Sequence, residues 1–507
     1  MNWWKSSKTF PLRIFLVALI LRLIPVLATR TMGIGLDDMF QYDMLARSIA
    51  AGNGYRWYAQ EDLPLIEQYM PLDFANVNYD PRGVPTSFRP PLYPAFLAVV
   101  YLVAGVGTQR FFIARLVQVP LAAVLAPLTY ALGRRFFPEK PRIGVIASWM
   151  IALYPLLVIY PLSLATENLF FVLVLASTLV LLKAADSVKS QAGAGPSPTA
   201  SSQKAFGRIW NGLIATRWFI LAGILLGLTA LTRSVALGMA GLAFLWIWFG
   251  LHQPRMGIVL LAFLALVTVP WMVRNTIVDK RLTGIESALG YDLYVGYNPQ
   301  GTGTFQYPIS LDLMPIVDDG ERDAIGREKA LEFIRADPGR FPYLVVRRAG
   351  YFFGLERRAL TYFYSNDYLG YIPTPLLLSI AFIVCIPFVI VSVSAAFGIA
   401  MTRWRKETRL LILLIVGYVT PHLFIIAEDR FHLAMVPFFT MLAAFFWSAG
   451  GPAMKAHWQT RRGRIALGLA VLATLLLCFN WTAELLRDSS KLTQLLSSGG
   501  NQTYFPY

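Results

Sequence analysis

The segment that decides both the fold and the function of this chain is 35-GLDDMFQYDMLARSIAAGNGY-55. It follows the first apolar run and carries three carboxylates within seven residues. A row of residues at helical spacing predicts a helix over 38–51 with one semi-apolar face: Asp38, Tyr42, Leu45 and Ile49. Gly52 and Gly54 then end it. An acidic amphipathic helix beside a membrane span indicates a reaction site at the bilayer surface; the alternative is a solvated helix whose acids only cap its N-terminus.

The composition is that of a polytopic membrane protein. Of the 507 residues, 56% are hydrophobic and only 15% are charged, against about a quarter in soluble domains. The net charge of +16 does not indicate nucleic acid, because the basic residues cluster between apolar runs, as the positive-inside rule expects. Cys385 and Cys478 both lie in apolar runs, which supports neither a disulfide framework nor a cysteine metal site.

The basic clusters set the topology. Lys5 and Lys8 place the N-terminus inside, and the first span is retained because no small-residue cleavage site follows it. The basic loop at 134–142 belongs inside only if the short, proline-initiated segment 91–107 does not cross, so we expect a juxtamembrane or re-entrant helix there. Eleven spans result: 11–29, 111–132, 143–161, 167–182, 218–232, 235–250, 257–273, 373–399, 410–427, 433–449 and 465–482.

Three regions follow from this topology. Residues 1–273 form a transmembrane core with a catalytic first external loop at 30–110, residues 274–370 form a second external region with a helix at 318–336, and residues 371–507 supply the last spans and a short external tail. We expect the loop 183–217, which contains the low-complexity patch 192-AGAGPSPT-199, to be cytoplasmic and disordered.

The ionisable residues of interest gather on the outer face: Asp37, Asp38, Asp43, Arg89, Glu167, Arg233, Arg274, Glu428, Asp429 and Arg430. A carboxylate there could take the proton of an attacking hydroxyl, and guanidinium groups could hold a phosphate leaving group. Glu167 could instead favour a helix N-terminus, and Arg233 and Arg430 could snorkel to the interface. We interpret His422 and His432 as packing residues, because no metal-ligand pattern accompanies them.

Several motifs occur in one order and on one face of the predicted membrane: 38-DMFQYDMLA-46, 52-GNGY-55, 89-RPPLYP-94, 133-GRRFF-137, 166-TEN-168, 231-LTR-233 and 428-EDRFH-432 with Pro437 after it. This series resembles the GT-C membrane glycosyltransferases, and within them the protein-mannosyltransferase superfamily with its aminoarabinose and galacturonosyl transferases of lipopolysaccharide. The likeness is strongest over 15–250. The chain lacks the extended soluble C-terminal domain of the larger members.

The resemblance implies an all-α GT-C fold and assigns roles. It implies that Asp38, with Asp37 beside it, is the catalytic carboxylate and that Glu167 is a second acidic partner. It implies that Arg233 and Arg430 contact the lipid phosphate. The motifs also place five further residues among the expected substrate-binding residues: Tyr42, Asp43, Arg89, Tyr93 and Glu428.

The function that these implications support is an inverting glycosyltransferase of the bacterial inner membrane, active on the periplasmic side. It would pass a sugar from a polyprenyl-phosphate donor to a glycan, lipid or protein hydroxyl, and it has no nucleic-acid partner. Because only some relatives bind a divalent metal, no cofactor is certain, and Mg²⁺ or Mn²⁺ at Asp37, Asp38 and Glu167 stays open. The alternatives are a polyprenyl-linked polysaccharide polymerase or ligase and a secondary transporter.

Overall fold

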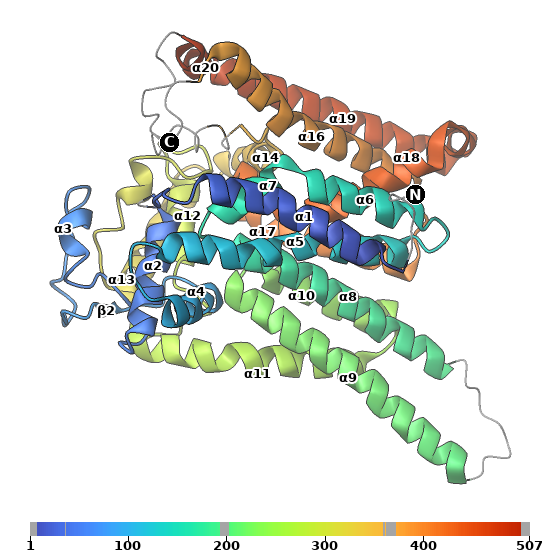
Figure 1. The fold of residues 1–507 in the computed structure, drawn as a ribbon, viewed down its shortest axis with the longest axis horizontal. Helices are drawn as coiled ribbons and strands as arrows, with labels where there is room; N and C mark the ends of the chain where they lie inside the picture. The colour runs from blue at the N-terminus through green and yellow to red at the C-terminus, as the bar shows by residue number, and fades with distance from the viewer. Residues whose placement is uncertain (1–7, 36, 193–201, 358–359, 361–371, 498–507) are drawn as a thin grey trace.

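A computed structural model describes residues 8–35, 37–192, 202–357, 360 and 372–497. Within these residues, eight helices are long and apolar enough to cross a membrane. They run roughly alongside one another (Figure 1), which confirms the prediction of an all-α polytopic membrane protein. They are α1 (Phe10–Ala28), α5 (Arg110–Phe136), α8 (Glu167–Ala192), α11 (Pro254–Asp279), α16 (Thr374–Met401), α17 (Lys406–Phe424), α18 (Val436–Trp458) and α19 (Arg461–Arg487).

Shorter or broken helices occupy the other three predicted spans. α6 (Arg142–Leu153) continues into α7 (Pro155–Ile159) and η1 (Tyr160–Leu162) across a 57° bend, because Pro155 interrupts the helix at extended Tyr154. The apolar part of α9 (Ser202–Thr232) and the pair α10 (Ala236–Leu245) with η2 (Trp246–Gly250) supply the remaining two. Helix α4 (Leu92–Ala104) has 13 residues, short of the ~20 that a span needs, which fits a segment that does not cross.

Small residues let the long helices approach closely. A Cβ atom added to Gly398 on α16 would lie 2.2 Å from the carbonyl oxygen of Leu442 on α18. The two helices lie side by side along much of their length (Figure 1). Backbone contact of this kind is the usual way in which helices associate when lipid removes the hydrophobic driving force.

Gly398→Ala is therefore expected to lower the free energy of unfolding by about 1–3 kcal/mol, the usual cost of overpacking. Thermal unfolding of the detergent-solubilised protein would measure it. Gly468→Ala on α19 is the matched control, because a Cβ atom there meets nothing within 4 Å. Equal unfolding temperatures for the two variants would contradict the close packing of α16 on α18.

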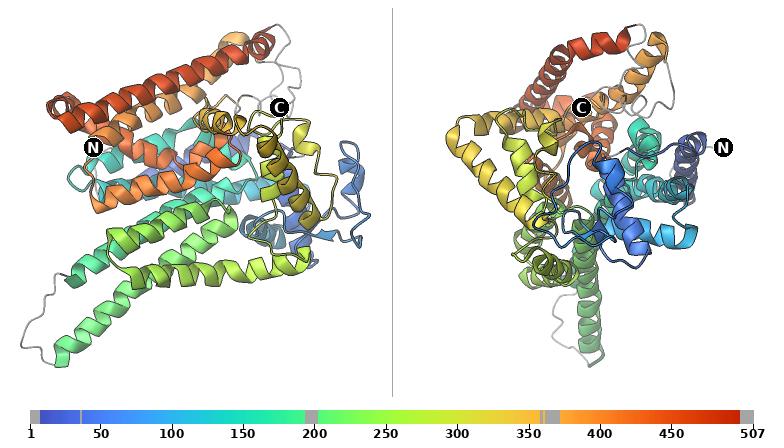
Figure 2. Two further views of the ribbon diagram at one scale, coloured as in Figure 1. Left: turned by 180° about the vertical axis from the view of Figure 1, so that it is seen from behind. Right: turned by 90° about the vertical axis from the view of Figure 1, so that its left-hand side faces the viewer.

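The polar segments assemble at one end of the bundle (Figure 2). The first includes α2 (Asp38–Ala50), α3 (Leu63–Ile66) and the antiparallel pair β1 (Arg56–Trp57) and β2 (Val84–Pro85). The second includes α12 (Leu289–Tyr297), η3 (Ile309–Leu311), α13 (Asp319–Ala336) and α14 (Arg340–Phe352). The two segments share a separate apolar core, so they form one cap over the helices. Helices α2 and α13 lie where the sequence predicted them.

The C-terminal tail and the loop 183–217 differ in part from the sequence predictions. The predicted short tail is partly helical, since α19 extends to Arg487 and α20 (Ser489–Leu496) follows. The prediction that the loop 183–217 is disordered is wrong for both of its flanks, because α8 continues to Ala192 and α9 begins at Ser202. The Gly- and Pro-containing residues are confined to the centre of this loop, so the residues on either side continue the spans as helices. Residues 193–201 lie outside the described residues.

Candidate functional site

The acidic pair at the start of α2 is built by helix capping. Asp37 is the N-cap, and its Oδ1 accepts a hydrogen bond from the backbone N–H of Met39 at 2.9 Å. Asp38 becomes the first helical residue, and its carboxylate is released for tertiary contacts. The capping interpretation of the sequence is thus right for Asp37, and it explains how Asp38 is aimed.

Asp38 lies between two arginines from distant parts of the chain. Its Oδ1 accepts from Arg89 and its Oδ2 accepts from Arg430 at 3.1 Å. Burial would raise the pKa of Asp38, but the charges of Arg89 and Arg430 outweigh it and hold that pKa well below its usual range. Arg89 also donates to Gln41 at 2.8 Å, and Arg430 donates to the buried Glu428 at 2.7 Å. Asp38 is therefore an ionised carboxylate in a cationic setting.

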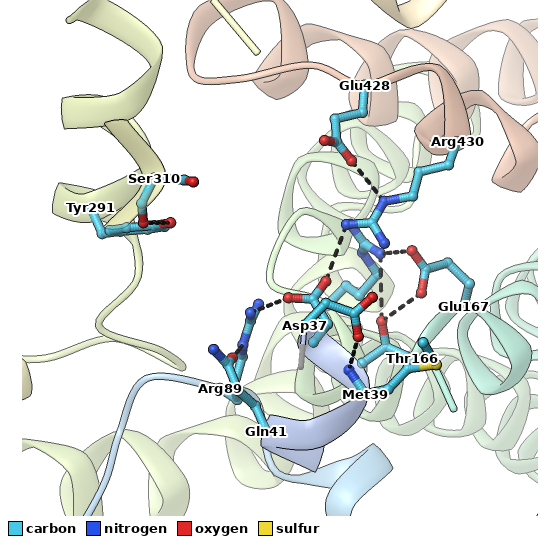
Figure 3. Close-up of polar contacts among 12 residues, drawn as sticks. Asp37, Met39, Gln41, Arg89, Thr166, Glu167, Tyr291, Ser310, Glu428 and Arg430 are labelled. Atoms are coloured by element: carbon cyan, nitrogen blue, oxygen red, sulfur yellow. Dashed lines mark hydrogen bonds and ion pairs between the residues drawn. The ribbon is translucent and has the colours of Figure 1, made fainter. Parts of the chain in front are cut away.

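Glu167 and Arg233 form a second ion pair close to the first. Glu167 begins α8 and Arg233 directly follows the end of α9, and their side chains meet at 2.5 Å. Thr166 donates to the other carboxylate oxygen of Glu167 at 3.1 Å. Figure 3 shows the side chains of Glu167, Thr166 and Arg430 close to Asp37. Only 4% of Glu167 is exposed, so Arg233 is what balances its charge.

A cavity of about 1030 Å³ opens at this point. It brings together seven of the residues that the sequence predicted: Asp37, Asp38, Tyr42, Arg89, Arg233, Glu428 and Arg430. Glu167 does not line the cavity, but it accepts a hydrogen bond from Arg233, which does. Burial raises the pKa of Tyr42 to about 12, so its phenol stays neutral. The cavity thus places three guanidinium groups near the Asp38 carboxylate, and the carboxyl groups of Asp37 and Glu428 also line it.

Besides Glu167, two further predicted residues lie outside the cavity lining. Asp43 is fully buried and accepts from Tyr101, Arg47 and Arg110 at 2.8–2.9 Å, so its acceptor capacity is spent inside the protein. Tyr93 is also fully buried and packs edge-on against Tyr42 with ring centroids 5.2 Å apart. Asp43 belongs to the helix that carries Asp38 and Tyr93 packs against that helix, and neither residue lines the cavity.

Helix α5 fixes the two acidic loops relative to each other. Arg115, fully buried, donates to the carbonyl oxygens of Met32 and Gly33 ahead of α2 and to that of Leu162 ahead of α8, the last at 2.8 Å. Gln118, one turn further, donates to Pro161 and Ser163. One helix face therefore sets the positions of Asp38 and Glu167 together.

The second polar region supplies cavity residues that the sequence analysis missed. Glu286 and Asp292 line the wall formed by 284–292, and Ser234 donates to Glu286. Burial and then the charge of Glu286 raise the pKa of Asp292 to about 8, and burial raises the pKa of Glu286. Tyr291 donates to the Ser310 carbonyl oxygen at 2.8 Å across the cavity from Asp37 (Figure 3). No periodicity or motif marks these residues in the sequence.

Asp292→Asn is expected to change how stability depends on pH. The unfolded carboxyl ionises near pH 4, whereas the folded one keeps its proton to about pH 8. The folded state binds the extra proton between these values, so the free energy of unfolding falls as pH rises through that interval. The asparagine variant lacks this loss. The difference in unfolding temperature, variant minus wild type, should therefore be larger at pH 8 than at pH 5. Parallel profiles of unfolding temperature for the two proteins from pH 5 to 8 would contradict this prediction.

The carboxylates do not fit a divalent cation in this arrangement. Among the residues that the structure describes, no three Asp, Glu, His or Cys side chains come together as metal ligands. Asp38 faces two guanidinium groups and Glu167 faces a third, and positive charge at contact distance opposes cation binding. Mg²⁺ or Mn²⁺ at Asp37, Asp38 and Glu167 remains a prediction from the resemblance alone.

No protein-family model and no curated protein matches the chain. Among solved structures, it is similar to the archaeal oligosaccharyltransferase AglB of Archaeoglobus fulgidus in complex with an inhibitory peptide and a dolichol-phosphate, with 14% identity, a TM-score of 0.48, and 99% of this chain covered. The chain spans about 60% of the length of that protein. It is also similar to ArnT of Cupriavidus metallidurans bound to undecaprenyl phosphate, with 14% identity, a TM-score of 0.37, and 89% and 80% of the two chains covered.

Proposed function

We propose that this chain is a membrane glycosyltransferase that moves a sugar from a polyprenyl-phosphate carrier to an acceptor hydroxyl. The observation that carries the proposal is the grouping of Arg89, Arg233 and Arg430 around the Asp38 carboxylate in one cavity. Guanidinium groups suit a phosphate, because each can donate two hydrogen bonds to its oxygens. The carboxylate supplies the base that an attacking hydroxyl needs.

The reaction proceeds by a single displacement. The acceptor oxygen forms a bond to the anomeric carbon of the sugar, and the bond from that carbon to the phosphate oxygen breaks with its electron pair. Arginines stabilise the charge that grows on the leaving phosphate. Asp38 takes the hydroxyl proton, and the anomeric centre is inverted.

The two ion pairs of Asp38 have a use in this scheme. While they persist, the carboxylate is a weak base, because its pKa is held low. A bound lipid phosphate competes for the same donors of Arg89 and Arg430 and partly neutralises them, which raises the basicity of Asp38. The general base therefore gains strength when the donor is in place.

We place the site on the periplasmic side of a bacterial inner membrane. The N-terminal end of α1, the C-terminal end of α8 and the N-terminal end of α9 lie at the end of the bundle opposite the polar cap (Figure 1). The sequence around them is basic, as expected of the cytoplasmic side. Nucleotide-activated sugars are not expected outside the cytoplasm, so a lipid-linked donor suits this location. The acceptor class is a glycan, lipid or protein hydroxyl.

Transfer from a radiolabelled pool of polyprenyl-phosphate sugars, in membranes that contain the protein, tests the proposal. We expect label to leave the carrier and appear in acceptor material. Arg82→Gln is the matched control, because this exposed arginine pairs with Asp80 away from the cavity and should transfer normally. Failure of the wild type to consume any lipid-linked sugar from a broad pool would overturn the proposal and favour a polymerase, ligase or transporter.

Removal of divalent metal ions should leave the transfer rate within about twofold of its starting value, because guanidinium groups already balance the charge at Asp38 and Glu167. The measurement is the initial rate before and after treatment with a chelator. If the rate collapsed on chelation and recovered with added Mg²⁺ or Mn²⁺, the site would bind a divalent cation after all and this prediction would be wrong.

A further inference from the structure

His432 lies two residues after Arg430, in the 3₁₀ turn η4 (Asp429–Ala434). It is fully buried, and its ring stacks on Phe388 of α16 with centroids 3.7 Å apart. The sequence analysis expected a packing residue. The packing is present, but the ring also takes part in a buried polar cluster.

Both ring nitrogens of His432 face acceptors. Nδ1 lies 2.8 Å from the carbonyl oxygen of Phe352, and Nε2 lies 2.9 Å from Oε1 of Glu356. A carbonyl oxygen can only accept, so Nδ1 carries a proton and donates it to Phe352, while Nε2 bonds to Glu356. His432 and Glu356 are thus a hydrogen-bonded pair with 0% and 1% of their surfaces exposed.

Glu356 depends on only two donors. Its Oε1 also accepts from the hydroxyl of Tyr154 at 2.5 Å, whereas its Oε2 is buried with no hydrogen-bond partner in the described part of the chain. A buried carboxylate with so few donors is costly unless a cation stays beside it. The His432 ring is the group that lies beside this carboxyl.

The cluster joins three segments at the base of the cavity wall. Tyr154 lies at the bend between α6 and α7, Glu356 follows α14, and His432 lies in η4. Short 3₁₀ turns have weak internal hydrogen bonding, so the position of η4 depends on what holds it from outside. The same turn carries Phe431, whose ring lies 5.1 Å from the guanidinium carbon of Arg233.

We propose that His432 is a positioning residue for Arg430: its buried pair with Glu356 holds the turn 429–434 so that the Arg430 guanidinium meets Asp38 and the donor phosphate. This inference rests on the proposed function for its substrate and on the structure for its contacts. Arg430 extends from this turn to Asp38, and His432 ties the same turn to Glu356. Loss of the anchor should therefore act through Arg430.

A double-mutant cycle in the transfer assay tests this. At equal amounts of folded protein, His432→Gln should raise the KM for the lipid donor about 10-fold or more and lower kcat less. In an Arg430→Gln background the same substitution should cause no further loss, because its effect passes through Arg430. Tyr154→Phe, which removes one donor and no charge, should give a smaller change in the same direction and serves if His432→Gln folds poorly.

Glu484→Gln is the matched control. Glu484 is a mostly buried carboxylate that pairs with Arg357, next to Glu356, but it touches neither η4 nor the cavity. It should lower the unfolding temperature and leave KM and kcat unchanged. If His432→Gln shows no more than the behaviour of Glu484→Gln, or if its loss is undiminished in the Arg430→Gln background, the positioning role is wrong.

The failure of this inference and that of the proposed function can be told apart. If the wild type transfers sugar and the cycle is additive, only the positioning role fails. If the wild type transfers none, the proposed function fails, and the same cycle is then measured as unfolding temperature. Non-additive shifts for His432→Gln and Arg430→Gln would still support the anchor, and additive shifts would overturn it.

Discussion

Asp38→Asn is expected to lower kcat for sugar transfer by about 10³-fold, within the range that a general base contributes. The substitution keeps the shape of the side chain and removes the charge that takes the hydroxyl proton. It also weakens the contacts to Arg89 and Arg430, so the KM for the lipid donor can fall while kcat collapses. Initial rates at saturating donor, at equal amounts of folded protein, measure the effect.

Asp80→Asn is the control for Asp38→Asn. Asp80 also pairs with arginine, at 2.6 Å from Arg82, but it does not line the cavity. Its variant should transfer at the wild-type rate. If Asp38→Asn keeps its kcat, the glycosyltransferase proposal survives but Asp38 is not the base, and the carboxylates of Glu286 and Asp292 on the facing wall become the residues to substitute next.

Arg233→Gln should produce the second large effect, in two separable parts. Glu167 is left buried without its cation, which should cost about 3 kcal/mol of stability. The donor phosphate loses one guanidinium group, which should lower kcat/KM about 10²-fold. Unfolding temperature and transfer rate measure the two parts independently.

The double variant Arg233→Gln with Glu167→Gln separates these parts. It removes the uncompensated carboxylate, so most of the lost stability should return. Transfer should stay low, because the cavity still lacks the Arg233 cation. Recovery of the transfer rate together with stability would mean that Arg233 serves only to balance Glu167.

Patterns that depend on local periodicity and charge were sufficient to predict much of the fold. Long apolar runs predicted the spans, and the spacing of Asp38, Tyr42 and Leu45 predicted α2, because helical faces repeat at a fixed interval. Because the positive-inside rule puts the basic loops on the cytoplasmic side, the acidic motifs were predicted on the outer side. That is why seven predicted residues line one cavity although they come from widely separated segments.

The remaining features depend on tertiary contacts that no local pattern reports. Asp43 has the same charge and helix as Asp38, but it faces Arg110 and Tyr101 inside the protein. Asp292 and Glu286 lie in a polar region without clear periodicity, and only folding brings them to the cavity. For His432 the sequence indicated burial correctly, but its partner Glu356 lies 76 residues earlier in a segment that carries no signal.

The pairing of Asp38 with Arg430 has a consequence for biogenesis, because 392 residues separate the two. At about 5–20 residues per second, the ribosome adds Arg430 roughly 20–80 s after Asp38. During that time the first loop and most helices have already been delivered to the membrane, while the charge centre is incomplete. Under the proposed function, a nascent chain can therefore engage a lipid phosphate with at most two of the three arginines, and catalytic competence arrives only when the segment after α17 is inserted. Quality control that retains unfinished chains would, for this protein, also retain only inactive ones.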